Sequence, residues 1–304
     1  MKKEVDLESY VQNFLSKRYI REEVELDEYI IKALELLEST DSFVRNRENE
    51  YEEKINDKIQ WQITHDMYER SYEYVCGSLS LFILGQLQSC EASCRTAIEG
   101  AVNLHFVSIG DTTDKIVSYF KNHFEVEKKQ NSSWEKAVDS SDVEDELKEY
   151  HRSLIDKKYE VLSSYEAVLK KVMAEHNVDI SLSETRWPSA YDRFRLIDDE
   201  IGYRTIYTAL CSQSHNDPED LLNHLICRAF GHDGFTAAKK AEQYFFSLYM
   251  VLQAVKYHIM ASVMYLGKFD IPMIELTDKY KETLNLLMQS QKHKDILLVE
   301  LSKQ

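Results

Sequence analysis

The scarcity of turn-forming residues constrains the fold of this chain more than any other feature. Only 8 glycines and 3 prolines occur among its 304 residues. Because these two residue types form most turns, their scarcity predicts a few long helices rather than many short strands. Hydrophobic residues make up 43% of the chain, enough to bury a sizeable core. We therefore predict an all-α multi-helix bundle, with long antiparallel helices and a buried central helix.

The central helix is predicted at the most hydrophobic long stretch, from Tyr244 to Leu266. This stretch is long enough to cross a bilayer, but Gln253, Lys256 and His258 would be costly in lipid. We therefore expect a buried helix and no membrane association. The first residues lack the apolar core of a signal peptide, and the five cysteines have no disulfide-framework spacing. Both features predict a cytoplasmic protein with reduced thiols.

The pattern along the chain predicts an N-terminal helical region, residues 1–74, and a main helical bundle, residues 75–304. Within the bundle, residues 126–142 are polar and lack a strong helical period, which predicts an exposed loop or mobile insertion. Beyond this segment, apolar residues at three- and four-residue steps predict a long amphipathic helix over 143–176. That helix would form one arm of a helical hairpin.

Two capping motifs flank the predicted insertion. Asp111 is a candidate N-cap for a helix that runs to about His123. Ser141 and Glu144 have the spacing of a capping box, which would begin the next helix.

The chain is strongly acidic. Its 53 acidic and 37 basic residues give a net charge of −16. Such a chain is repelled by nucleic acid at long range, so a general nucleic-acid coat protein is excluded. A local basic pocket could still bind RNA, because net charge governs steering rather than the chemistry of one cleft.

Charged residues interrupt an apolar helix predicted between Cys90 and Gly110. Arg95 and Glu99 lie four residues apart on one face of this helix, so they can pair with each other. Charged side chains rarely enter a core unless they are paired or functional. We expect both to be mostly buried, as a structural ion pair or as a catalytic or ligand-binding pair.

A second polar cluster lies at residues 203–217, within another apolar segment. It contains Arg204, Tyr207 and His215, and a proline after the cluster would place His215 at a helix–helix junction. His215 could be a general acid–base group or a packing residue. If the two helices pack together, His215 would lie near Arg95 in one composite site.

The cysteines offer a metal-binding alternative. Cys90 with Cys94, and Cys211 with His215, each place two possible ligands on one helix face. Two such pairs facing each other would make a four-ligand zinc site. The other interpretation is that the thiols pack as small apolar groups. No HExxH motif or serine elbow occurs, and no cofactor is expected.

The motifs CRTAIEGAVNLHFV and IGYRTIYTALCSQSHNDPEDL resemble a bacterial family catalogued as domain of unknown function 5677. The resemblance covers residues 75–265, and the matching positions are Arg95, Glu99, Tyr207 and His215. It implies a helical fold more firmly than an activity.

More distantly, the chain is similar to the HEPN superfamily, which includes many metal-independent ribonucleases of toxin–antitoxin and antiphage systems. Those enzymes use an arginine followed by a histidine after four to six residues. Here Arg228 and His232 are too close together, and Arg204 and His215 are too far apart. The resemblance implies an RNA-directed effector in which Arg95 or Arg204 binds phosphate and His215 is the general acid–base.

The alternative is a non-catalytic helical module that binds a protein partner or a small signal. Its interface would be the acidic surface and the long helix 143–176. A basic cleft would favour the RNA-directed enzyme, and an acidic or dry one would favour the module. Either protein could form a homo-oligomer.

Overall fold

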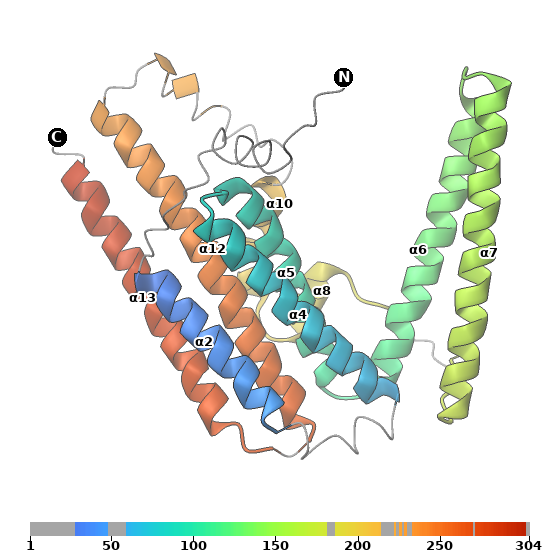
Figure 1. The fold of residues 1–304 in the computed structure, drawn as a ribbon, viewed down its shortest axis with the longest axis horizontal. Coiled ribbons are helices and arrows are strands. Elements are labelled where there is room, and N and C mark those ends of the chain that lie inside the picture. Colours follow the sequence, from blue (N-terminus) through green and yellow to red (C-terminus); the bar gives the residue numbers. More distant parts are fainter. Residues whose placement is uncertain are drawn as a thin grey trace, which may run out of the picture.

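All regular secondary structure in the described part of the chain is helical, as predicted (Figure 1). The computed structural model describes residues 28–47, 59–180, 186–213, 222, 225, 226, 228, 229, 233–269 and 271–301. In chain order the helices are α2 (Glu28–Arg45), α4 (Ile59–Ile83), α5 (Leu87–Ser108), α6 (Thr112–Ser140), α7 (Asp145–Glu175), α8 (Ala190–Leu196), α9 (Glu200–Gly202), the π-helical turn η1 (Tyr203–Tyr207), α10 (Thr208–Gln213), α12 (Asp233–Gly267) and α13 (Ile274–Leu301).

The centre of the bundle is α12, which confirms the predicted buried helix. It packs against α5, α13, α4 and α2. Gln253, Lys256 and His258 are buried on it among apolar side chains, as the sequence places them. None of the helices in the described residues combines the length and the apolarity that crossing a membrane requires.

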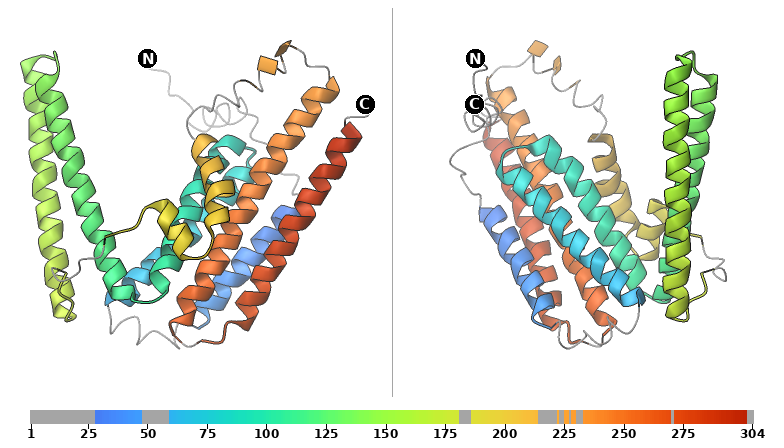
Figure 2. Two further views of the ribbon diagram at one scale, coloured as in Figure 1. Left: turned by 180° about the vertical axis from the view of Figure 1, so that it is seen from behind. Right: turned by 45° about the vertical axis from the view of Figure 1, so that its right-hand side comes forward.

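Helices α4 and α5 form an antiparallel pair on one side of α12 (Figures 1 and 2). They meet through a tight turn in which Gly85 has φ of +72°, a left-handed conformation that suits glycine. Helix α4 runs without interruption through residues 74 and 75, where the sequence had predicted a regional boundary. The two predicted regions therefore share one continuous helix.

Helices α6 and α7 form a two-helix arm that stands apart from the bundle over most of its length (Figures 1 and 2). The arm contains the segment 126–142, which was predicted to be an exposed loop or a mobile insertion. The loop prediction was wrong, because helix α6 continues through the segment to Ser140. The buried side chains Phe124, Asn131 and Val138 recur every seven residues and form the seam against α7.

The two predicted caps have different outcomes. Asp111 caps α6, because its Oδ1 accepts a hydrogen bond from the amide of Asp114 at 3.1 Å. The capping box at Ser141 and Glu144 does not form. The Ser141 hydroxyl instead donates to the carbonyl of Val138 and ends α6, and the side chain of Glu144 makes no capping bond to α7.

The short helices α8 and α10 pack against α5, and the turn that begins α9 contacts α12. Asp199 Oδ1 accepts a hydrogen bond from the amide of Gly202 at 3.0 Å. The hydroxyl of Tyr257, on α12, donates to the other carboxylate oxygen. A Cβ at Gly202 would overlap the Tyr257 hydroxyl, so this contact requires glycine.

Candidate functional site

A groove with two lobes runs along one side of α5. One lobe, about 620 Å³, lies between α4 and α5 and reaches α6. The other, about 730 Å³, lies between α5, α6 and residues 186–193. Glu99, Asn103 and Tyr119 line both lobes, so the lobes meet at these residues. We call this two-lobed cavity the α5 groove.

Glu99 is held at the junction of the two lobes by side chains from outside its own helix. Its Oε1 accepts a hydrogen bond from Arg193 Nη2 at 2.8 Å, which is also an ion pair. Its Oε2 accepts a hydrogen bond from the Tyr207 hydroxyl at 2.7 Å. One side chain from α8 and one from η1 therefore fix the orientation of this carboxylate, which leaves it little freedom to act as a mobile base.

Arg95 and Glu99 share Tyr207 as a neighbour. The Arg95 guanidinium lies 5.6 Å from the centre of the Tyr207 ring. Hydrogen bonding to Tyr207 raises the pKa of Arg95, with smaller contributions from Cys211 and Glu99. However, Glu99 forms its ion pair with Arg193, and both Arg95 and Glu99 are half-buried because they face the groove. The prediction that both are mostly buried was therefore wrong.

Arg193 is the buried cation of this cluster, with a side chain that is only 6% exposed. Its Nη1 donates to the carbonyl of Pro188 at 2.6 Å, and its guanidinium lies 5.2 Å from the centre of the Trp187 ring. Burial lowers the pKa of Arg193, and the charge of Glu99 opposes that effect. Arginine remains charged even so, because its ordinary pKa is above 12. The Arg193–Glu99 pair is therefore structural and holds α8 on α5.

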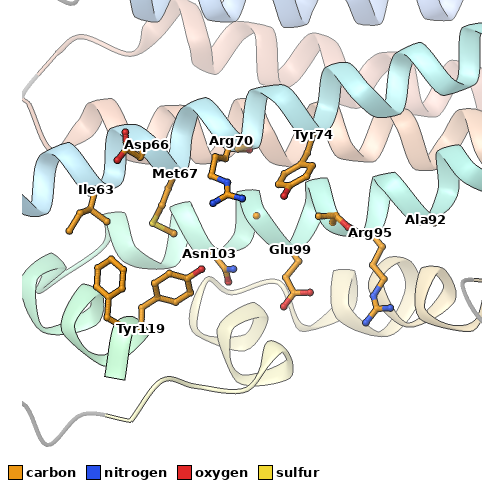
Figure 3. Close-up of a pocket in the computed structure, with 14 residues that line it drawn as sticks. Ile63, Asp66, Met67, Arg70, Tyr74, Ala92, Arg95, Glu99, Asn103 and Tyr119 are labelled. Atoms are coloured by element: carbon orange, nitrogen blue, oxygen red, sulfur yellow. The ribbon is translucent and has the colours of Figure 1, made fainter. Parts of the chain in front are cut away.

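Two further arginines lie at opposite parts of the groove. Arg70 reaches the first lobe from α4, next to Tyr74 (Figure 3). Arg186 lines the second lobe beside Trp187. Both are exposed, and neither forms an ion pair within the part of the chain that the structure describes. Their guanidinium donors are therefore available to a ligand.

Polar and aromatic side chains complete the lining. Figure 3 shows Arg95, Glu99 and Asn103 along the same side of α5, with Tyr119 of α6 beside Asn103. The Asn103 Oδ1 atom is buried and has no hydrogen-bond partner among the described residues. A buried polar atom without a partner is costly, so this oxygen is suited to accept a hydrogen bond from a ligand or a water molecule.

Residues 61–232 match a family of unknown function, DUF5677. The chain belongs to this family. The match covers α4 to α10 and so includes most of the α5 groove. No curated protein and no solved structure matches the chain.

Three of the five site residues predicted in this DUF5677 chain lie together. Arg95, Glu99 and Tyr207 form the cluster at the groove. Arg204 lies apart from it, on the exposed side of η1, where it is 3.6 Å from Glu200. The fifth residue, His215, lies outside the described residues.

The structure describes three of the four ligands proposed for a zinc site, because His215 lies outside the described residues. The thiols of Cys90 and Cys94 lie 3.9 Å apart in the core, and hydrogen bonding between them together with burial raises the pKa of Cys90. A raised pKa disfavours the thiolate form that binds zinc. Cys211 lies instead beside Arg95. Within the described ranges, no cluster of three or more histidine, cysteine, aspartate or glutamate side chains could hold a metal ion.

Sequence reasoning missed Arg193 and the two free arginines, Arg70 and Arg186. Arg193 stands beside Phe194, which is fully buried, on a seven-residue helix that has no clear apolar period. The signal in the sequence was a charged residue close to two large aromatic residues, Trp187 and Phe194, which indicates a buried arginine. Arg70 and Arg186 carry no local signal, because only the packing of distant segments places them at one groove.

Proposed function

We propose that the α5 groove binds the phosphate backbone of single-stranded RNA, and that the protein is a HEPN-like RNA-directed effector of a toxin or antiphage defence system. The observation that carries the proposal is the arginine lining of the groove in a chain of net charge −16. Arg70 and Arg186 have no ion-pair partner in the described residues, and Arg95 lines the first lobe together with Arg70. Planar guanidinium groups suit the recognition of phosphate.

The groove also suits nucleotides in size and in lining. Each lobe lies within the range of roughly 300–1,000 Å³ that is typical of small-ligand pockets. Tyr74 and Phe120 line the first lobe, and Tyr119 lines both. Exposed aromatic rings can stack on unpaired bases, which favours a single strand over a duplex.

The carboxylate of Glu99 does not preclude an anionic ligand. Arg193 and Tyr207 each donate a hydrogen bond to it, and Arg193 compensates its charge. Asp66 and Asp192 also line the groove, so the groove has no strong positive electrostatic potential. The proposed phosphate contacts therefore depend on the individual arginines. We therefore expect modest affinity that decreases with salt. Three phosphate contacts predict a slope of about −2 for log K against log salt concentration on a single strand.

Binding is tested by the fluorescence anisotropy of a labelled single-stranded oligoribonucleotide titrated with the full chain at several salt concentrations. Arg70→Ala and Arg186→Ala should each weaken binding roughly tenfold and reduce the salt slope by about 0.7. Arg195→Ala is the matched control, because Arg195 is exposed on α8 but does not line the groove. Wild-type affinity in both groove variants would contradict the proposal.

Cleavage is tested separately from binding. The sequence similarity assigns the general acid–base role to His215, so His215→Ala should abolish RNA cleavage and leave RNA binding intact. If the wild-type chain binds RNA without cleaving it, the non-catalytic module becomes the better description. If it binds only mononucleotides, the groove holds a small signal instead.

A further inference from the structure

Helix α7 carries two separate apolar faces, and the described residues cover only one of them. The covered face packs on α6 through Ile155 and Leu162, which are buried. Two ion pairs flank this contact, from Lys158 to Glu127 at 2.8 Å and from Lys128 to Glu166 at 2.6 Å. These contacts fix which side of α7 faces its neighbour in the arm.

The second face is an exposed apolar stripe that follows the length of α7. Its members recur at three- and four-residue steps, as in one strand of a coiled coil, except between Leu154 and Val161, where Lys157 interrupts the row. Tyr165 and Val168 are each 60% exposed and Tyr150 is 58% exposed. The stripe consists of Leu147, Tyr150, Leu154, Val161, Tyr165, Val168 and Val172. Single exposed apolar residues are common on protein surfaces, but an ordered row of this length is typical of an interface.

We propose that this stripe pairs with the same stripe of a second copy of the chain, with the two α7 helices antiparallel. Four members are placed symmetrically about Val161: Tyr150 and Val172 lie 11 residues from it on either side, and Leu154 and Val168 lie 7 residues from it. A two-fold interface brings identical surfaces together, so a stripe of this symmetry is self-complementary. The arm stands apart from the bundle, which leaves α7 room for a second helix (Figure 2).

The charges at the ends of α7 select the antiparallel arrangement. Glu146 lies in the first turn and Lys171 near the end of the helix, both at the flank of the stripe, whereas Lys170 is paired with Glu166 at 3.0 Å. Glu146 and Lys171 form no ion pair within the described residues. In an antiparallel pair each acidic end meets the basic end of the other copy, whereas a parallel pair would place like charges together. Antiparallel helix dipoles also attract.

The first test measures the mass of the full chain by sedimentation velocity. Protein concentrations of about 1 to 100 µM would detect dimers with dissociation constants in the micromolar range. The wild-type chain should form a dimer, and Tyr165→Glu and Val168→Glu should each be monomeric. Both residues are exposed, so these variants should keep the wild-type melting temperature. Ala167→Glu is the matched control, because it adds the same charge on another face of α7 and should leave the dimer intact. A monomeric wild-type chain, or dimers in both stripe variants, would overturn the proposal.

The second test addresses orientation. The variants Glu146→Lys and Lys171→Glu should each have a higher dimer dissociation constant than the wild-type chain. An equimolar mixture of the two should recover the wild-type dissociation constant, because both helix ends are then complementary. If each variant dimerises as well as the wild type does, the antiparallel arrangement is wrong.

Discussion

Glu99 accepts hydrogen bonds from two buried residues, Arg193 and Tyr207, although it faces a groove itself. The Arg193 side chain is 6% exposed and that of Glu99 is 35% exposed. Removing the carboxylate charge would therefore leave a buried guanidinium without its counter-charge. The cost of losing one partner of a fully buried pair is about 3–5 kcal/mol, and exposure of Glu99 to solvent reduces it.

We accordingly expect Glu99→Gln to lower the free energy of unfolding by about 2 kcal/mol, measured by urea denaturation. Glu73→Gln is the control, because Glu73 is exposed on α4 and should change stability by less than about 0.5 kcal/mol. If Glu99→Gln unfolds at the wild-type urea concentration, the pair with Arg193 does not stabilise the fold.

Individual side chains also decide how close two elements approach. At the contact between α9 and α12, the Tyr257 hydroxyl occupies the space that a Cβ at Gly202 would need. At Gly100, on α5, a Cβ would have no heavy atom within 4 Å. Two glycines in helical segments therefore have opposite roles.

At the contact between α9 and α12, we predict that Gly202→Ala lowers the free energy of unfolding by about 1–3 kcal/mol through overpacking. Gly100→Ala should raise it by about 0.5–1 kcal/mol, because alanine loses less conformational entropy than glycine in a helix. Thermal melts of both variants check the two signs. A stabilising Gly202→Ala would show that α9 and α12 are not in close contact.

The two-helix arm contains one polar side chain in its seam. Asn131 is fully buried, and neither its Nδ2 nor its Oδ1 has a hydrogen-bond partner in the described residues. An asparagine at such a position reduces stability but can fix the register of paired helices.

Replacing Asn131 with leucine should raise the melting temperature by several degrees, the equivalent of about 1 kcal/mol. Gln130→Leu, at the exposed neighbouring position, should leave the melting temperature unchanged. A lower melting temperature in Asn131→Leu would indicate that the amide is paired in solution.

The molecule as a whole should be sensitive to mild acid because two histidines are buried without charge. Burial lowers the pKa of His258 and of His105 from 6.5 to about 4. Between pH 4 and pH 6.5 the unfolded chain therefore binds more protons than the folded chain. Stability is therefore complete above pH 6.5 and decreases as the pH falls toward 4.

Each histidine should contribute about 3 kcal/mol to this loss, from the size of its pKa shift. In His258→Met the free energy of unfolding should fall less between pH 6.5 and pH 4 than in the wild type, whatever its value at pH 7. His123→Met, which changes an exposed histidine, should keep the wild-type pH dependence. Equal pH dependence in all three proteins would mean that His258 is not buried in its neutral form.

Local sequence information determined most of the helical architecture. The few glycines and prolines, the apolar stretch of α12 and the Asp111 cap each act within one helix, so their effects can be read from neighbouring residues. The same reasoning failed at residues 126–140. The seam of the arm is narrow, and buried Asn131 interrupts its apolar period, so the segment resembles a polar loop.

The candidate site combines both kinds of information. The sequence by itself determined that Arg95 and Glu99 share one face of a helix. The structure selected Tyr207, and not Arg204, from the second polar segment as their neighbour. Only the tertiary structure decided that Glu99 pairs with Arg193, which lies 94 positions away along the chain. It also decided that Arg70 and Arg186 reach the same groove. Helix periodicity places a residue on a face, whereas partners across a groove depend on how distant helices pack, and no local pattern encodes that packing.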